Sequence, residues 1–296
     1  MPPSQQHTLA RPAVIEGVGI HTGERVSLIL HPAAAHAGIG FRRTDVTDRD
    51  GFIPARGEAV CATQLGTVIG NADGVSVSTI EHLMAVLNAL SIDNVLIELH
   101  GPEVPIMDGS CEPFCVAVER AGRRRQAAAR RYIEILEPIM VQDGDKRACL
   151  RPAASFKVAF EILFDDPAIG AQKVDLVVDE HSFRRELADS RTFGFLEDVE
   201  RLHAAGLARG GSFDNVVVID KGAVLNPGGL RRPDECVRHK ALDAIGDLYL
   251  LGAPLLGRYE GVYAGHALNN ALVREVARQP QAWRYAETPL SFAQAG

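Results

Sequence analysis

A chain of 296 residues exceeds the usual size of one compact domain, so two domains of ordinary size are expected. With 46% hydrophobic and 23% charged residues, the composition excludes a disordered or fibrous protein. The formal net charge of -7 argues against a nucleic-acid-binding protein, because phosphate neutralisation requires a basic surface.

The sequence has none of the features of secreted or membrane-spanning proteins. No apolar stretch follows a basic segment at the N-terminus, and no window of about 20 apolar residues exists that spans a bilayer. The five cysteines include no CxxC pair, and their odd number is typical of free thiols in a reducing compartment. We therefore expect a cytoplasmic protein without stable membrane insertion.

The first half of the chain contains strands followed by helices. Alternating Val, Ile and Leu over 14–30 predict a strand hairpin. Apolar residues at helical spacing predict a helix over 79–90, and the apolar run 94–99 predicts a buried strand. A further helix is expected over 113–120. The arginine-rich run 123–131 is interpreted as a solvated linker.

The second half repeats this order, and the boundary between the two predicted domains, 1–126 and 127–296, is placed within the arginine-rich run. Segregated strands and helices indicate an α+β fold, and the similar order of the halves suggests a duplicated unit. The pattern predicts strands at 132–141, 148–150, 156–163, 215–219 and 255–263, and helices at 181–188, 197–205, 235–251 and 266–278.

The segment 237–247, inside the predicted long helix, is the most informative for chemistry. His239 and Asp243 are four residues apart, so both lie on one helical face and can converge on one ion, and Asp247 continues this stripe. The same spacing is common on exposed faces, where a carboxylate simply supports a histidine. Alone, the pair is weak evidence for a metal site.

A second histidine, His82, follows Glu81 near the start of a helix rich in apolar residues. Residues 78–81 match the capping-box pattern, in which Glu81 would accept a backbone N–H at the helix start. A first-turn acid beside a histidine is also where a general base stands in zinc hydrolases that use two histidines and a carboxylate. The residues alone leave both interpretations open.

Seven separate segments resemble the UDP-3-O-acyl-N-acetylglucosamine deacetylase family of lipid A synthesis, in family order and over nearly the whole chain. The segments are 17–23, 78–83, 105–110, 191–195, 210–214, 237–247 and 265–270. The resemblance implies two α+β domains of similar topology, with helices packed between two sheets in a β-α-α-β sandwich. It also implies an inserted subdomain in each domain and an active site between them.

The resemblance further implies a zinc-dependent hydrolase that removes the N-acetyl group of UDP-3-O-(3-hydroxyacyl)-N-acetylglucosamine. The products would be the free amine and acetate, in the committed step of lipid A biosynthesis. By motif match, His82, His239 and Asp243 would be the metal ligands and Glu81 the general base. Fe²⁺ is compatible with the same ligands as Zn²⁺.

Three more residues receive catalytic roles from the resemblance. Thr192 would stabilise the oxyanion, and His266 would supply positive charge or a proton to the leaving amine. Asp247 would hydrogen-bond His266 and raise its pKa. Without the resemblance, Thr192 is an ordinary loop residue and His266 a neighbour of a helix start. Some relatives have a cysteine at the position of Gly66, so we expect no thiolate contact to the metal here.

The remaining implied residues contact the substrate. Lys240 lies about 100° around the helix from His239, so we expect it to point away from the metal face and to bind a substrate phosphate. Phe164 and Asp198 match positions near the nucleotide and sugar, although they also fit a core aromatic and a surface acid. The implied acyl-chain passage includes Phe193, Leu196, Val199, Gly211, Ser212, Val216 and Val218.

Two other functions are compatible with parts of the sequence. A catalytically silent binding protein that kept the acyl-sugar site would bind the nucleotide sugar without releasing acetate. A zinc peptidase is disfavoured, because there is no His-Glu-x-x-His segment and His82 and His239 lie on separate helices. The sequence therefore predicts a monomeric, cytoplasmic zinc hydrolase whose partner is its acyl-nucleotide-sugar substrate.

Overall fold

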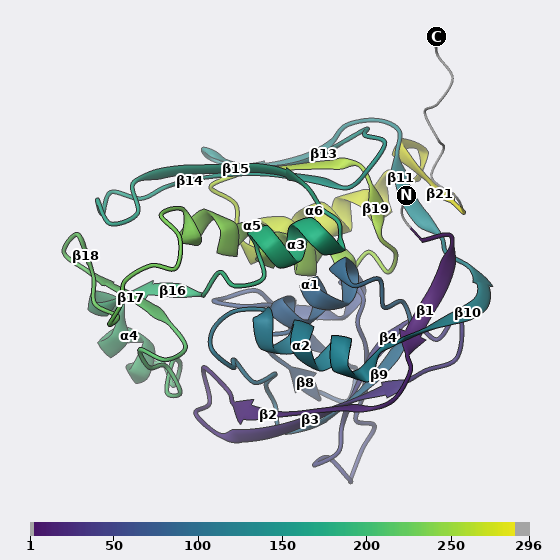
Figure 1. The fold of residues 1–296 in the computed structure, drawn as a ribbon, viewed down its shortest axis with the longest axis horizontal. Helices are drawn as coiled ribbons and strands as arrows, with labels where there is room; N and C mark the ends of the chain where they lie inside the picture. The colour runs from purple at the N-terminus through teal and green to yellow at the C-terminus, as the bar shows by residue number, and fades with distance from the viewer. Residues whose placement is uncertain (1–2, 288–296) are drawn as a thin grey trace.

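The computed structural model describes residues 3–287. Two five-stranded mixed sheets form the outer layers, and the main helices lie between them (Figure 1). This arrangement is the β-α-α-β sandwich that the resemblance implied, and the α+β prediction is confirmed. Among the described residues, no helix combines the length and apolar character needed to cross a bilayer.

The two large sheets have the same connectivity. In spatial order, the first contains β2 (Ala13–Val18), β3 (Arg25–Pro32), β9 (Val95–His100), β4 (Ile39–Arg43) and β5 (Phe52–Pro54). The second contains β12 (Ile139–Asp143), β13 (Lys146–Arg151), β20 (Arg258–Val262), β14 (Lys157–Leu163) and β15 (Ala171–Val177). In each sheet the central strand is the last along the chain. β9 lies antiparallel to β3 and parallel to β4, and β20 lies antiparallel to β13 and parallel to β14 in the same way. This shared order supports the duplicated unit that the sequence suggested.

Each half carries a small three-stranded sheet inserted before its central helix. The first insert consists of β6 (Val60–Ala62), β7 (Val68–Gly70) and β8 (Ser76–Val77). The second consists of β16 (Phe193–Phe195), β17 (Val217–Asp220) and β18 (Ala223–Val224), and it projects at the left of Figure 1. A third small sheet contains β19 (Leu255–Leu256), β11 (Tyr132–Ile135) and β21 (Trp283–Ala286).

The arginine-rich run forms a strand, so its interpretation as a linker is wrong. β10 (Arg123–Ala129) pairs antiparallel with β1 (Gln5–Leu9), which satisfies the backbone of the strand. The three arginines at its start stay exposed, whereas Arg130, just after it, is buried and pairs with Asp93 at 2.8 Å. The partner strand lies more than 100 residues earlier, so local composition does not reveal the pairing. The domain boundary at residue 126 falls inside β10 and stays a prediction; the outermost residues of both predicted domains, 1–2 and 288–296, lie outside the described residues.

The long helices form where apolar periodicity predicted them. The helices are α1 (Glu81–Ala89), α2 (Glu112–Ala121), α3 (Glu180–Glu186), α4 (Val199–Ala204), α5 (Glu235–Tyr249) and α6 (His266–Arg278). Short 3-10 turns lie at Gly57–Ala59, Leu196–Asp198 and Pro280–Ala282. Strand β15 was not predicted, because this outer strand faces solvent on one side and its sequence AQKVDLV has little apolar character.

Helices α1 and α5 pack backbone to backbone at the centre of the molecule. Every residue of α1 is buried. On α5, Gly246 faces the first turn of α1: a Cβ at this position would overlap the carbonyl oxygen of Glu81 and lie 2.8 Å from its carbonyl carbon. Only glycine fits this close approach, which brings the first turn of α1 beside the polar face of α5.

We expect Gly246→Ala to destabilise the protein by about 1–3 kcal/mol, because the added methyl group forces the two helices apart. The sign is informative, since alanine ordinarily stabilises a helix interior by up to about 1 kcal/mol relative to glycine. Thermal and urea unfolding measure the effect. Gly194→Ala is the control, because a Cβ there meets nothing within 4 Å. An unfolding midpoint for Gly246→Ala equal to that of the control would contradict the close packing.

Candidate metal and catalytic site

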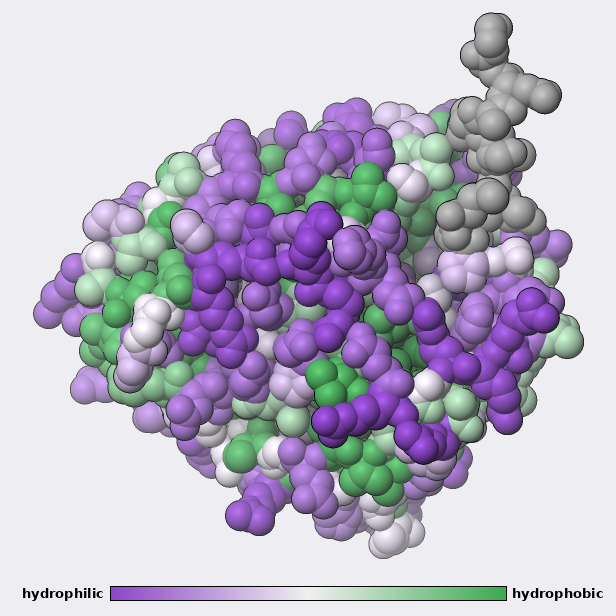
Figure 2. All heavy atoms as spheres, viewed as in Figure 1, coloured by the Kyte–Doolittle hydropathy of each residue, from purple (hydrophilic) through white to green (hydrophobic). Residues whose placement is uncertain are grey.

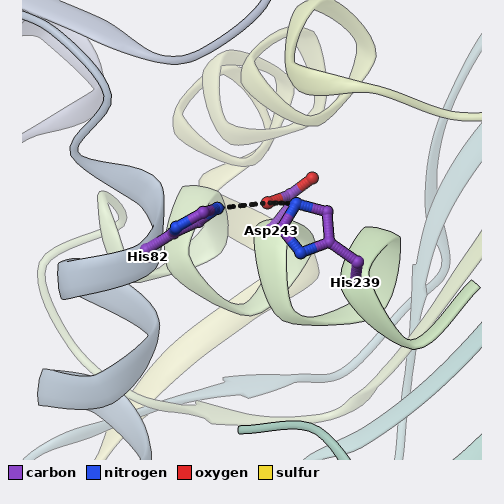
Figure 3. Close-up of side chains that lie close together, drawn as sticks. All are labelled: His82, His239 and Asp243. Atoms are coloured by element: carbon purple, nitrogen blue, oxygen red, sulfur yellow. Dashed lines mark ion pairs between the residues drawn. The ribbon is translucent and has the colours of Figure 1, made fainter. Parts of the chain in front are cut away.

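Three buried side chains from the two central helices converge on one point (Figure 3). His82 comes from α1, and His239 and Asp243 come from α5. Their donor atoms lie within 4.8 Å of one another, and Nε2 of each histidine lies 3.5 Å from Oδ1 of Asp243. Two imidazole nitrogens and one carboxylate oxygen can hold an ion tetrahedrally and leave a position for water or substrate. The structure therefore brings the three predicted ligands together.

The chemistry of these donors fits a divalent cation. Oδ1 of Asp243 is buried and has no hydrogen-bond partner among residues 3–287, a costly state that a cation at this point relieves. Burial would raise the pKa of Asp243, but His239 and Lys240 hold it well below its usual value. Burial lowers the pKa of His239 to about 4, so this imidazole is neutral near pH 7, the form that binds metals.

The ring of His239 is oriented by the segment that precedes the second insert. Its Nδ1 lies 3.1 Å from the carbonyl oxygen of Ser190, so Nδ1 carries the proton and Nε2 is free for a metal. The next residue, Arg191, donates from its backbone N–H and from Nε to the buried carboxylate of Glu235, at 2.9 and 2.8 Å. Glu235 lies one turn before His239 on α5. These contacts hold Arg191, the residue before Thr192, against the helix that carries two of the predicted ligands.

Glu81 does not cap its helix. α1 begins at Glu81 with no side-chain cap in the described structure, and Oε2 of Glu81 instead accepts the N–H of Thr67, at 2.9 Å, from another loop. The capping-box interpretation is therefore wrong. Gly66 approaches so closely that a Cβ there would lie 3.0 Å from Oε1 of Glu81. Burial raises the pKa of Glu81, although His266 and His82 oppose the shift, and a raised pKa suits a general base.

Asp247 and His266 form a buried pair on the other side of the site. Nδ1 of His266, the first residue of α6, lies 2.9 Å from Oδ2 of Asp247. Burial alone would lower the pKa of His266, but the charge and hydrogen bond of Asp247, helped by Glu81 and Asp243, raise it to about 9. The other ring nitrogen, Nε2, lies 3.8 Å from Oδ2 of Asp243, so the ring of His266 faces one of the predicted metal ligands.

Lys240 lies closer to the metal ligands than the sequence predicted. Its Nζ donates to Oδ2 of Asp243 at 3.2 Å, so the expectation that it points away from the metal face is wrong. The angle of about 100° separates Lys240 from His239, but residues three apart on a helix are neighbours, and the long side chain reaches the next turn. The ammonium group thus lies beside the second carboxylate oxygen of a predicted metal ligand.

The predicted substrate-contacting residues gather around the second insert. Phe164 packs against Phe193 with ring centroids 5.7 Å apart, and against Phe195 at the same distance. The ring of Phe193 also lies 6.4 Å from that of His239, which connects this aromatic cluster to the metal ligands. Asp198, in contrast, pairs with Arg201 at 2.6 Å, as a surface acid would.

The predicted acyl-passage residues are not core residues. Leu196, Gly211 and Ser212 are exposed, and the other four are half-buried. Figure 2 shows apolar surface over the second insert, at the left of the view. A cavity of about 230 Å³ beside this insert is lined by other residues, namely Asp165, Asp166, Phe195, Glu197, Ile219, Asp220 and Lys221.

Sequence reasoning missed the polar residues that hold the predicted catalytic side chains in place. Thr67 donates to Asp247, Asn269 donates to the same carboxylate, and Glu235 holds Arg191. Asn269 and Arg191 lie inside segments that resemble the family, so the resemblance was the one signal that could have pointed to them. Their partners lie far along the chain, so the local sequence does not show what they hold. All five cysteines are free thiols, as expected.

Comparison with known proteins agrees with the geometry. A family model described as LpxC, UDP-3-O-acyl N-acetylglycosamine deacetylase, matches residues 6–278. The chain is 64% identical over 279 residues to the UDP-3-O-acyl-N-acetylglucosamine deacetylase of Phenylobacterium zucineum, with 94% of this chain and 95% of the relative covered. It is 50% identical over 278 residues to the enzyme of the same name from Myxococcus xanthus, with 94% and 88% covered. For the Shewanella frigidimarina protein of that name, identity is 44% over 295 residues, with 97% and 96% covered. The chain belongs to the UDP-3-O-acyl-N-acetylglucosamine deacetylase family.

Proposed function

We propose that this protein hydrolyses the N-acetyl group of UDP-3-O-(3-hydroxyacyl)-N-acetylglucosamine to the free amine and acetate, with Zn²⁺ held by His82, His239 and Asp243. The observation that carries the proposal is the buried triad of metal donors with Glu81 beside it, in a chain of the deacetylase family. The reaction is the committed step of lipid A biosynthesis, and we propose that a cytoplasmic monomer performs it.

Glu81 is the proposed general base. Zn²⁺ held by His82, His239 and Asp243 would supply a Lewis acid for the carbonyl oxygen and would lower the pKa of water toward about 7. Glu81 directly precedes the ligand His82, and its buried carboxylate accepts a proton from the attacking water. The N–H of Thr67 holds one carboxylate oxygen in place. The other oxygen, Oε1, would receive the proton.

Thr192 and His266 act on the charges that develop as the amide bond breaks. The hydroxyl of Thr192 donates to the carbonyl oxygen, where negative charge accumulates. His266 carries a proton at neutral pH and gives it to the nitrogen of the leaving amine, which otherwise departs as a poor leaving group. Asp247 keeps the proton on His266 until that step.

The substrate occupies the face between the metal triad and the second insert. Lys240 contributes positive charge for a phosphate, shared with its contact to Asp243. Phe164 and Asp198 bind the nucleotide and sugar parts. The half-exposed apolar side chains of the insert accept the acyl chain. Each CH₂ group that is buried there stabilises the complex by about 0.8 kcal/mol.

The test is incubation of the purified protein with the acyl-nucleotide sugar at several acyl lengths, with acetate and free amine measured by mass spectrometry. Zn²⁺ and Fe²⁺ are returned separately to metal-free protein to identify the metal. Acetate release that depends on the ion supports the proposal. Metal-loaded protein that binds the substrate and releases no acetate would identify a catalytically silent binding protein instead.

Replacing Asp247 with asparagine is expected to move the alkaline limb of the pH profile to lower pH. Activity requires protonated His266, so it falls as pH rises through the pKa of this group, about 9 in the wild-type protein. The charge of Asp247 is the main contribution that raises the pKa of His266 against the lowering effect of burial. Without this charge, the pKa of His266 falls by about one unit or more. The dependence of kcat/KM on pH measures the shift. An unchanged alkaline limb would assign it to a different group.

A further inference from the structure

Thr67 contacts both the proposed base and the proposed acid pair. It lies in the loop between β6 and β7 and is buried. Its backbone N–H donates to Oε2 of Glu81 at 2.9 Å, and its hydroxyl donates to Oδ1 of Asp247 at 2.6 Å. Glu81 opens α1 in the first half of the chain, whereas Asp247 lies on α5 in the second. One residue thus connects the groups that take up and deliver protons.

The hydroxyl of Thr67 completes the fixation of the Asp247 carboxylate. Oδ2 of Asp247 lies 2.9 Å from Nδ1 of His266 and accepts a bond from Asn269 at 2.8 Å. Oδ1 has Thr67 as its donor. Rotation of an aspartate carboxylate about its last bond is soft, so donors on both oxygens are needed to hold its plane. Without the Thr67 hydroxyl, the carboxylate that orients His266 is free to turn.

The backbone and side chain of Thr67 make separable contributions. The N–H bond to Glu81 and the carbonyl contact to Ile80, at 3.4 Å, are backbone contacts that any non-proline residue makes. The hydroxyl is required for the bond to Asp247 at 2.6 Å and for a longer contact with Nδ1 of His266 at 3.4 Å, so both side-chain contacts go to the acid pair. Valine has the same branched shape with a methyl group instead, so Thr67→Val removes both contacts and leaves a buried oxygen of Asp247 without its donor.

We propose that Thr67 is a positioning residue for the deacetylation, which aligns the acid pair through its hydroxyl while its loop holds the base. This inference rests on the roles proposed above for Glu81 and His266. Removing an outer hydrogen-bond partner of a catalytic or metal-binding group commonly costs about 10–100-fold in affinity or activity. Because the alignment matters during proton transfer, the loss falls on kcat and not on substrate binding.

The experiment compares Thr67→Val, Thr67→Ser and Thr8→Val with the wild-type protein. Thr8 is a matched control: it is fully buried, and its hydroxyl donates to the carbonyl oxygen of Asn94 at 2.6 Å, in a contact unrelated to the site. For each protein, kcat, KM, zinc content and unfolding temperature are measured. We expect Thr67→Val to lower kcat about 10–100-fold, with KM within about threefold and zinc content unchanged. Serine keeps the hydroxyl and restores kcat to within about threefold of wild type, whereas Thr8→Val changes only the unfolding temperature.

Three results would overturn the inference: a kcat of Thr67→Val no lower than that of Thr8→Val, a serine variant no better than the valine variant, or a loss explained by KM or zinc content. Each of these results can be obtained only when the wild-type protein is active. Such a result therefore contradicts the positioning role of Thr67 and leaves the proposed function standing. A metal-loaded wild-type protein without deacetylase activity contradicts both the proposed function and this inference.

Discussion

Replacing Glu81 with glutamine is expected to lower kcat by about 10²–10⁴-fold, the usual contribution of a general base. The amide has the same shape as the carboxylate, and its oxygen can still accept the N–H of Thr67, so the local structure should persist. It cannot accept a proton from water. Acetate release, followed together with the zinc content of the purified variant, measures the effect.

Substrate binding is the internal control for this variant. Because Glu81 acts on water, the affinity of the glutamine variant for the acyl-nucleotide sugar should stay within about threefold of wild type. A variant that retains zinc and turns over substrate at the wild-type rate would show that Glu81 is not the base. Loss of zinc would instead indicate that Glu81 supports the neighbouring ligand His82.

Removal of Asp243 is expected to abolish both metal binding and activity. Asp243→Ala deletes one of three donors and leaves two buried imidazoles without the carboxylate that faces them. Activity should fall more than about 10³-fold, because the metal lowers the pKa of water from 15.7 to about 7 and its loss removes that activation. Chelation of the wild-type protein should give the same loss, reversed by zinc.

Asp234→Ala is the matched control for this experiment. Asp234 directly precedes the first residue of the same helix, where its half-buried carboxylate pairs with Arg238 at 2.8 Å. Its removal deletes a carboxylate from α5 without touching the triad, so zinc content and activity should stay at wild-type levels. Full activity of a chelated wild-type protein, or of Asp243→Ala, would contradict the metal assignment.

The fold could be predicted where local pattern and tertiary structure agree. The structure gives α6 the predicted bounds, and α1 and α5 lie within one or two residues of theirs, because a long apolar stripe specifies a buried helix. β10 could not be predicted, because its pairing with β1 joins residues more than 100 positions apart. The polar strand β15 is held by its hydrogen bonds to β14, and the sequence of β15 alone does not show this pairing.

The site could be predicted only in part, and burial decides the rest. From spacing alone, His239 and Asp243 resembled an exposed pair; the structure buries both and places His82 opposite. Glu81 matched a helix cap by pattern, yet its partner is a loop that no local pattern reveals. The bond from Thr67 to Asp247 joins residues 180 positions apart, so only the folded chain shows it.

The equivalent positions of α1 and α5 in the two halves have a consequence for the stability of the folded protein. One half supplies His82 and the other supplies His239 and Asp243, so a bound ion acts as a crosslink between the halves. At a free-ion concentration 100 times the dissociation constant, such binding stabilises the folded chain by about 2.7 kcal/mol. A cell starved of the ion that the triad binds would therefore hold copies that are inactive and also more readily degraded by proteases, so metal supply would govern the abundance of the protein as well as its turnover.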